Sequence, residues 1–155
     1  MTSLKLHEVC KIAPPPSSPK SSFPLTFFDL LWLRFHPSEL IFFFSVPHLH
    51  PSSFFDTIVP KFKRSLSLTL QHFLPLAGNI VWPSDDSLKP VFQYNPGDSV
   101  SLTIAVSDSD FSHVLDYSPR DASHLVLLCP TWILLIHLLQ FFPCKSLCFP
   151  IMDFA

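Results

Sequence analysis

The sequence has 155 residues and a formal net charge of -2; only 14% of its residues are charged, while 48% are hydrophobic. This length suits one ordinary domain, and the apolar content exceeds what a disordered coil carries. The lack of net positive charge argues against nucleic acid as a partner, because binding to phosphates needs a positive field. With only 2 glycines the chain is also unsuited to a glycine-rich phosphate loop.

The first fifty residues indicate short elements separated by proline. A strand is predicted from Leu4 to Ala13, where polar and apolar residues alternate, and Pro14 to Ser22 is predicted to be a loop. Thr26 to Phe35 forms a compact apolar segment. Leu40 to Val46 is a continuous apolar run, which favours a strand buried on both faces.

The strongest helical pattern extends from Pro51 to Phe73. Apolar residues recur there at steps of three and four, which predicts one buried stripe on the helix. The stripe consists of Phe55, Ile58, Val59, Phe62, Leu66, Leu70 and Phe73.

Prolines, serines and a glycine suggest how this helix begins, bends and ends. Pro60 cannot donate its amide, so the regular part is predicted to follow it. Ser52 or Ser53 is predicted to cap the first turn. Pro75 is expected to end the helix, and Gly78 to permit the turn that follows.

Three short strands are predicted next, over Ile80–Trp82, Pro90–Tyr94 and Ser99–Val106. The residues Asn95 to Asp98 carry strong turn chemistry between the last two. Alternation in the third strand predicts that one of its faces is buried. Asp110 to Tyr117 is predicted to be a short helix.

Charge almost disappears from residue 127 onward. Val126 to Cys144 contains no charged residue and approaches the length of a membrane span. Prolines and polar residues interrupt it, so a membrane is an unexpected partner, and a small membrane-anchored protein using residues 126–144 is kept as an alternative.

The first residues and the cysteines bear on the compartment. Met1 to Lys11 has no apolar core of a secretory signal, so a cytoplasmic location is expected. The cysteines are then expected to be free thiols, and they lack the paired spacing of a zinc site. They are Cys10, Cys129, Cys144 and Cys148.

Four blocks of sequence, in order, resemble the N-terminal part of plant BAHD acyltransferases, especially the anthocyanin and phenolic glucoside malonyltransferase branch. They are PLTFFDLLW (Pro24–Trp32), SLSLTLQHFLPLAGNI (Ser65–Ile80), GDSVSLTIA (Gly97–Ala105) and SPRDASHLV (Ser118–Val126). The resemblance implies an α/β fold: the incomplete N-terminal half of a chloramphenicol-acetyltransferase-like two-domain architecture, with helices packed on a mixed sheet.

The resemblance also implies a reaction, the transfer of malonyl or hydroxycinnamoyl from acyl-CoA to a hydroxyl of a flavonoid, anthocyanin or phenolic glucoside. In the family the His of an H-x-x-x-D motif is the general base. None of the eight histidines here is followed by Asp four positions later, so no catalytic residue and no metal or bound cofactor is assigned. Acyl-CoA is the donor substrate that the family implies.

Two residues are candidates for substrate binding. His36 and Ser38 lie where related enzymes are thought to form the wall of the acceptor pocket; the alternative is a loop histidine before a helix-breaking proline.

Other conspicuous side chains have simpler interpretations. His72 is expected to be a half-buried packing residue, and His7-Glu8 the polar face of the first strand. Lys61, Lys63 and Arg64 are expected on a solvated helix face. The aromatic residues Phe27, Phe28 and Trp32 are expected in a core or an interdomain surface, Phe42–Phe44 in a sheet core, and Asp85-Asp86 in a turn.

Two segments are therefore predicted: residues 1–126, the family-like part, and residues 127–155, an apolar tail. Reading each codon of residues 128–155 from its third base permits a string that continues the family pattern, so we interpret the tail as frame-shifted. The chain is then expected to be truncated before the H-x-x-x-D motif and inactive, or a non-catalytic fragment. An unpaired sheet edge is expected to favour self-association.

Overall fold

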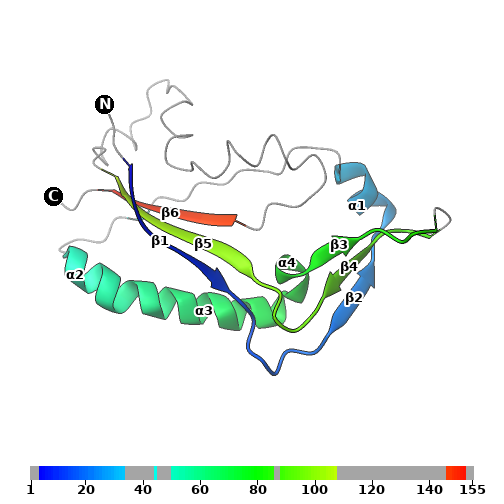
Figure 1. The fold of residues 1–155 in the computed structure, drawn as a ribbon, viewed down its shortest axis with the longest axis horizontal. Coiled ribbons are helices and arrows are strands. Elements are labelled where there is room, and N and C mark those ends of the chain that lie inside the picture. The colour runs from blue at the N-terminus through cyan, green and yellow to red at the C-terminus, as the bar shows by residue number, and fades with distance from the viewer. Residues whose placement is uncertain (1–3, 34–43, 45–49, 86–87, 108–145, 153–155) are drawn as a thin grey trace, which may run out of the picture.

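The computed structural model describes residues 4–33, 44, 50–85, 88–107 and 146–152 (Figure 1). The strand predicted over Leu40–Val46 lies outside these residues, apart from Phe44, and so does the helix predicted over Asp110–Tyr117. The described part combines helices with two three-stranded sheets, which agrees with the expected α/β class.

The first sheet has the order β1-β5-β6 and is called the mixed sheet below. Strand β1 (Leu4–Ile12) runs antiparallel to β5 (Val100–Ser107), and β6 (Ser146–Met152) runs parallel to β5 on its other side. The predicted strands at both β1 and β5 are confirmed to within a residue. Strand β6 falls in the tail, where the sequence pattern had predicted no element.

The second sheet is antiparallel throughout, with the order β2-β4-β3. It contains β2 (Ser21–Pro24), β3 (Asn79–Val81) and β4 (Val91–Tyr94). The last two confirm their predictions, whereas β2 begins inside the predicted loop. The strand signal there is weak, because two serines and a proline occupy three of its four positions.

The predicted long helix is confirmed but is divided into segments. A short helix α2 (Pro51–Ser53) leads into a π-helical turn η1 (Phe54–Ile58), and then into α3 (Val59–His72). Pro60 lies in the first turn of α3, where its missing amide costs little, as predicted. Figure 1 shows the helix lying along one face of the mixed sheet.

The predicted helix ends need correction. Neither Ser52 nor Ser53 makes a capping hydrogen bond: His50 precedes α2, and the side chain of Ser53, which precedes η1, caps nothing. Pro75 does not end α3, which stops at His72; it lies in the first turn of another short helix, α4 (Leu74–Ala77).

The remaining helix, α1 (Phe27–Trp32), lies within the predicted apolar segment and starts with a capping box. The Thr26 side chain accepts a hydrogen bond from the Asp29 amide, and the Asp29 carboxylate accepts one from the Thr26 amide at 2.7 Å. This pair satisfies two amides that a helix start leaves without partners.

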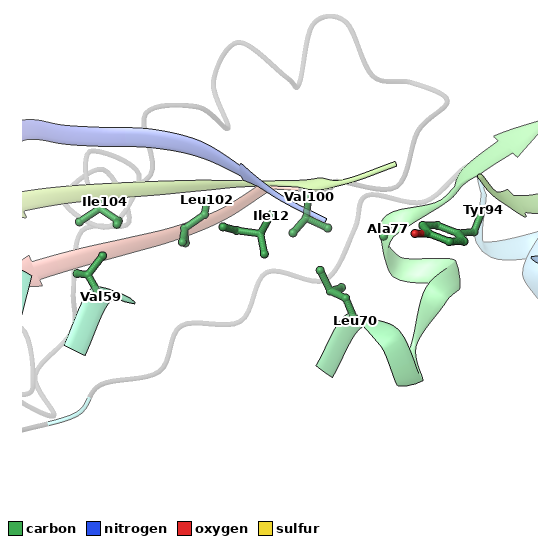
Figure 2. Close-up of a cluster of buried hydrophobic side chains, with 8 residues drawn as sticks. All are labelled: Ile12, Val59, Leu70, Ala77, Tyr94, Val100, Leu102 and Ile104. Atoms are coloured by element: carbon green, nitrogen blue, oxygen red, sulfur yellow. The ribbon is translucent and has the colours of Figure 1, made fainter. Parts of the chain in front are cut away.

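One apolar core joins both sheets and the helices (Figure 2). Figure 2 shows Val59 of α3 beneath Ile104 of β5, and Leu70 between the end of the mixed sheet and Ala77. Tyr94 of β4 is 2% exposed and extends this core into the antiparallel sheet. The predicted stripe supplies much of it, but its members Ile58 and Phe73 are 36% and 56% exposed.

Strand β5 is buried on both faces, not on one as predicted. Leu102 and Ile104 on the helix side are buried, and so are Thr103, Ala105 and Ser107 on the alternate positions. Small and polar side chains at those positions suggested a solvent face, whereas burial depends on what covers the sheet.

Glycine is required at Gly78 and at Gly97 for different structural reasons. Gly78 has an extended backbone, and a Cβ there would lie 2.6 Å from the Gln93 carbonyl oxygen, so close approach to β4 rather than turn geometry requires it. Gly97 has a φ of +101° in the predicted turn. That turn is closed by hydrogen bonds in both directions between Asn95 and Asp98, of 2.9 and 2.8 Å.

Candidate functional site

The residues predicted to bind the acceptor, His36 and Ser38, lie outside the described residues. Within the described ranges, His, Cys, Asp and Glu side chains form no group of three that could hold a metal ion. None of the helices described is both long and apolar enough to cross a membrane. The segment of the membrane alternative, residues 126–144, lies outside the described part.

One group of polar and aromatic side chains lies between β1 and the long helix. We call His7, Glu8, Cys10, Phe55 and Lys63 the β1–α3 cluster. The Lys63 Nζ lies 2.6 Å from each carboxylate oxygen of Glu8. This bidentate ion pair links the strand to the helix through two residues that are 55 positions apart in the chain.

A β-bulge explains why neighbouring residues of β1 both take part. The register to β5 shifts between Leu6 and Glu8, and an extra residue at this point lets consecutive side chains turn to one face. The His7 ring stacks on Phe55 with centroids 4.0 Å apart and an angle of 30° between the planes. Strand and helix are thus joined by one ring contact and one ion pair.

The electrostatics of the cluster favour fixed charges. The hydrogen bond from Lys63 lowers the pKa of Glu8, although partial burial opposes the shift. The same bond to Glu8 raises the pKa of Lys63. Glu8 is therefore a weaker base than a free carboxylate and Lys63 a weaker acid, so the pair is suited to holding β1 on α3 rather than to proton transfer.

The cluster corrects the interpretation of Lys63 as part of a solvated face. Its neighbours Lys61 and Arg64 are exposed as expected, but the side chain of Lys63 is only 26% exposed. The sequence carried a signal that could have found the pair: Glu8 shares a strand face with Cys10 and Ile12, and a carboxylate on a buried face needs a cation.

A second contact that the sequence did not reveal anchors the same helix. The Ser67 hydroxyl donates a 2.7 Å hydrogen bond to the carbonyl of Ala13, just after β1. Together with the ion pair, this bond holds α3 to β1 at two points one helical turn apart.

The other candidate residues occupy the surface. His72 is exposed, so its predicted role as a half-buried packing residue is wrong. Phe27 and Phe28 are 68% and 71% exposed, which excludes the core and leaves the interdomain surface as a prediction. Asp85 is exposed in a bend, and Asp86 lies outside the described residues.

Comparison with known proteins identifies the family. A model described as "Transferase family" matches residues 3–135. A malonyl-coenzyme:anthocyanin 5-O-glucoside-6'''-O-malonyltransferase of Salvia splendens is 45% identical over 132 residues, which cover 83% of this chain and 28% of that protein. Phenolic glucoside malonyltransferase 1 of Nicotiana tabacum is 42% identical over 124 residues, covering 79% of this chain and 27% of its own.

A relative that is named for a different acyl group has a comparable sequence identity to this chain. A coumaroyl-CoA:anthocyanidin 3-O-glucoside-6''-O-coumaroyltransferase 1 of Arabidopsis thaliana is 42% identical over 124 residues, 78% of this chain and 26% of its own. The chain thus spans 26–28% of the length of these three relatives. Since the family model covers most of the chain and the identities exceed 40%, the chain belongs to the BAHD acyltransferases of the Transferase family.

Proposed function

We propose that this sequence builds the first part of a cytoplasmic acyl-CoA-dependent O-acyltransferase that modifies a sugar hydroxyl of anthocyanins or phenolic glucosides. The observation that carries the proposal is the similarity over residues 3–135, with identities of 42–45% to two malonyltransferases named for glucosides. Malonyl is the proposed donor group, with coumaroyl or another hydroxycinnamoyl group as the second candidate because of the third relative.

The architecture proposed for the whole enzyme has two chloramphenicol-acetyltransferase-like domains. The described sheets and helices would form part of the first domain. His36 and Ser38 are proposed, from the resemblance, to lie in the wall of the acceptor pocket. The tail, residues 127–155, is proposed to be frame-shifted relative to the family.

The 155-residue chain is proposed to be inactive by itself. Deprotonation of the acceptor hydroxyl needs a general base, and no histidine of the chain belongs to an H-x-x-x-D motif. Among the described groups, His7 is stacked on Phe55, and Glu8 is held by Lys63. The carboxylate of Glu8 is a poor candidate for this base, because the hydrogen bond from Lys63 lowers its pKa.

Two assays test the proposal separately. Purified chain, malonyl-CoA and an anthocyanin glucoside are incubated, and CoA release and ester formation are followed by thiol titration and mass spectrometry. We expect no product above the protein-free control. Ester formation by the isolated chain would contradict the proposed inactivity but not the family role.

The family role is tested in a chimaera. The Salvia splendens malonyltransferase receives residues 3–107 of this chain in place of its matching segment, with the unaltered enzyme as the control. We expect malonyl transfer to persist, and His36→Ala within the chimaera to raise the acceptor KM more than that of malonyl-CoA. A folded but inactive chimaera would contradict the family role, and an unchanged acceptor KM would contradict the pocket-wall assignment.

A further inference from the structure

The two outer sides of the mixed sheet are protected in different ways. Strand β1, at one side, carries the exposed Lys5 and Lys11 and the bulge next to Glu8. Charged side chains and bulges are the usual devices that prevent a sheet edge from pairing with another chain. The outer edge of β1 is therefore poorly suited to binding a further strand.

Strand β5 has none of these devices. Its sequence, VSLTIAVS, contains no charged residue, no proline and no glycine, and its pairing with β6 shows no irregularity. An uncharged run rich in β-branched residues, without proline or glycine, is the composition of strands that associate when an edge is open. The side of β5 opposite β1 therefore needs a strand on it.

Strand β6 fills this place along almost the whole of β5. Seven successive residues pair in parallel, from Ser101 with Ser146 to Ser107 with Met152. Pro150 lies within β6, and a residue without an amide hydrogen is tolerated in an edge strand but not in a central one. Among the described strands the proline thus suits β6 to one outer position of the sheet, as the lysines and the bulge suit β1 to the other.

The connection between the two strands permits this pairing within one chain. A parallel crossover needs a dozen or more residues, and 38 residues separate Ser107 from Ser146. Because both strands belong to one chain, their pairing is intramolecular, whereas a free peptide has to reach β5 at a sufficient concentration.

We propose that this edge of β5 is a strand-acceptor site and that its resident occupant is the chain's own segment Ser146–Met152. By this occupancy the segment closes the edge through which self-association was expected, and it keeps the chain monomeric. The inference does not depend on the proposed function. It assigns the tail a structural role even if its reading frame is not that of the family.

The pairing is tested by a disulfide at the register position of a native cysteine. Cys148 is the partner of Thr103, and adjacent strands lie about 4.8 Å apart, within the Cα range of a disulfide. Thr103→Cys is made in a chain carrying Cys10→Ala, Cys129→Ser and Cys144→Ser. The matched control is Ala105→Cys, whose partner is Pro150 and which is about 6.6 Å further along the strand.

Mild oxidation is expected to link Thr103→Cys to Cys148 within the monomer at least about tenfold faster than in the control. Non-reducing gels and mass spectrometry of the linked peptide measure this difference. Equal rates in the two variants, or linkage found only in dimers, would overturn the proposal. In the unaltered chain, hydrogen exchange must also show protected amides in residues 146–152, and rapid exchange there would overturn it too.

The consequence for assembly is tested by detaching β6. The backbone amides of alternate residues in a strand point toward the same neighbouring strand. Pro150 has no amide hydrogen, so its position is assigned to the side away from β5, and the amides of Leu147 and Phe149 are then the expected hydrogen-bond donors to β5. The double variant Leu147→Pro, Phe149→Pro is expected to self-associate in light scattering, whereas Cys148→Pro, at an outward position, and the parent remain monomeric. A free peptide of residues 143–155 at about 1 mM is expected to restore the monomer. A double variant that stays monomeric, or association that the peptide does not reverse, would count against the site.

Discussion

Glu8 lies on the face of β1 that contacts the long helix, and its partner Lys63 reaches it from α3. With 40% of its side chain exposed, Glu8 is strongly screened by water, so the pair is worth far less than its short distance suggests. Its main effect is to specify position, because only one placement of α3 along β1 brings the two groups together.

The pH dependence of this pair can be predicted. The pKa of Glu8 is lowered from 4.5, so its stabilisation is present above that pH and is lost as the pH falls through the lowered value. The pKa of Lys63 is raised from 10.5, so its part is lost only as the pH rises through the raised value. Glu8→Gln is expected to reduce the free energy of unfolding by about 0.5–1 kcal/mol at pH 7.

Urea denaturation at several pH values measures this effect. The difference between parent and Glu8→Gln should shrink as the pH falls below 4.5, where the parent also loses the charge. The exposed Lys61 provides the control, since Lys61→Met on the same helix should change stability little at any pH. A difference for Glu8→Gln that does not vary with pH would show that the ion pair is not its source.

At the scale of elements, the π-helical turn decides which part of the predicted stripe is buried. Phe54 and Phe55 both pack against the core across η1, although consecutive residues of a regular helix point about 100° apart. After this turn, Val59 and Leu70 of α3 are buried, while Ile58 remains at the rim of the core.

Substitutions in the helix should follow this division. Leu70 is 3% exposed, and Leu70→Ala is expected to cost about 2–5 kcal/mol of stability because it leaves a cavity. Ile58 is 36% exposed, and Ile58→Ala is expected to cost about 1 kcal/mol or less. Chemical denaturation followed by circular dichroism compares the two; equal costs would contradict the assignment of the buried face.

Sequence patterns predicted the elements where local chemistry is decisive. The 3.6-residue period identified the long helix, Pro60 located its regular part, and the turn at Asn95–Asp98 placed β4 and β5. Patterns failed where tertiary contacts decide the outcome. Strand β2 forms because β4 offers it a partner, and the Glu8–Lys63 pair joins residues that no local period relates. The candidate residues His36 and Ser38 remain predictions.

At the scale of the whole molecule, the core makes the two sheets interdependent. Val100 and Leu102 of the mixed sheet share a cluster with Tyr94 of the antiparallel sheet and with Leu70 and Ala77 of the helices. Strands β4 and β5 are also separated by a single turn. Neither sheet could lose its structure without exposing apolar surface of the other.

We therefore expect one cooperative unfolding transition. Hydrogen exchange in increasing denaturant should show the amides of β1 and β4 becoming accessible together, with the same midpoint as the change in circular dichroism. Leu70→Ala should shift both sets equally, since Leu70 touches the shared core. Earlier exchange of β4 than of β1 would mean that the antiparallel sheet unfolds as a separate unit.

The pairing of β1 with β5 also has a consequence on the ribosome. Partners in this ladder lie between 88 and 103 positions apart in the chain. At synthesis rates of about 5–20 residues per second, β1 is made roughly 5–20 s before its partner. During that interval the side chain of Ile12, which is 9% exposed in the folded chain, has no core to join, so nascent β1 is a segment on which a chaperone could act.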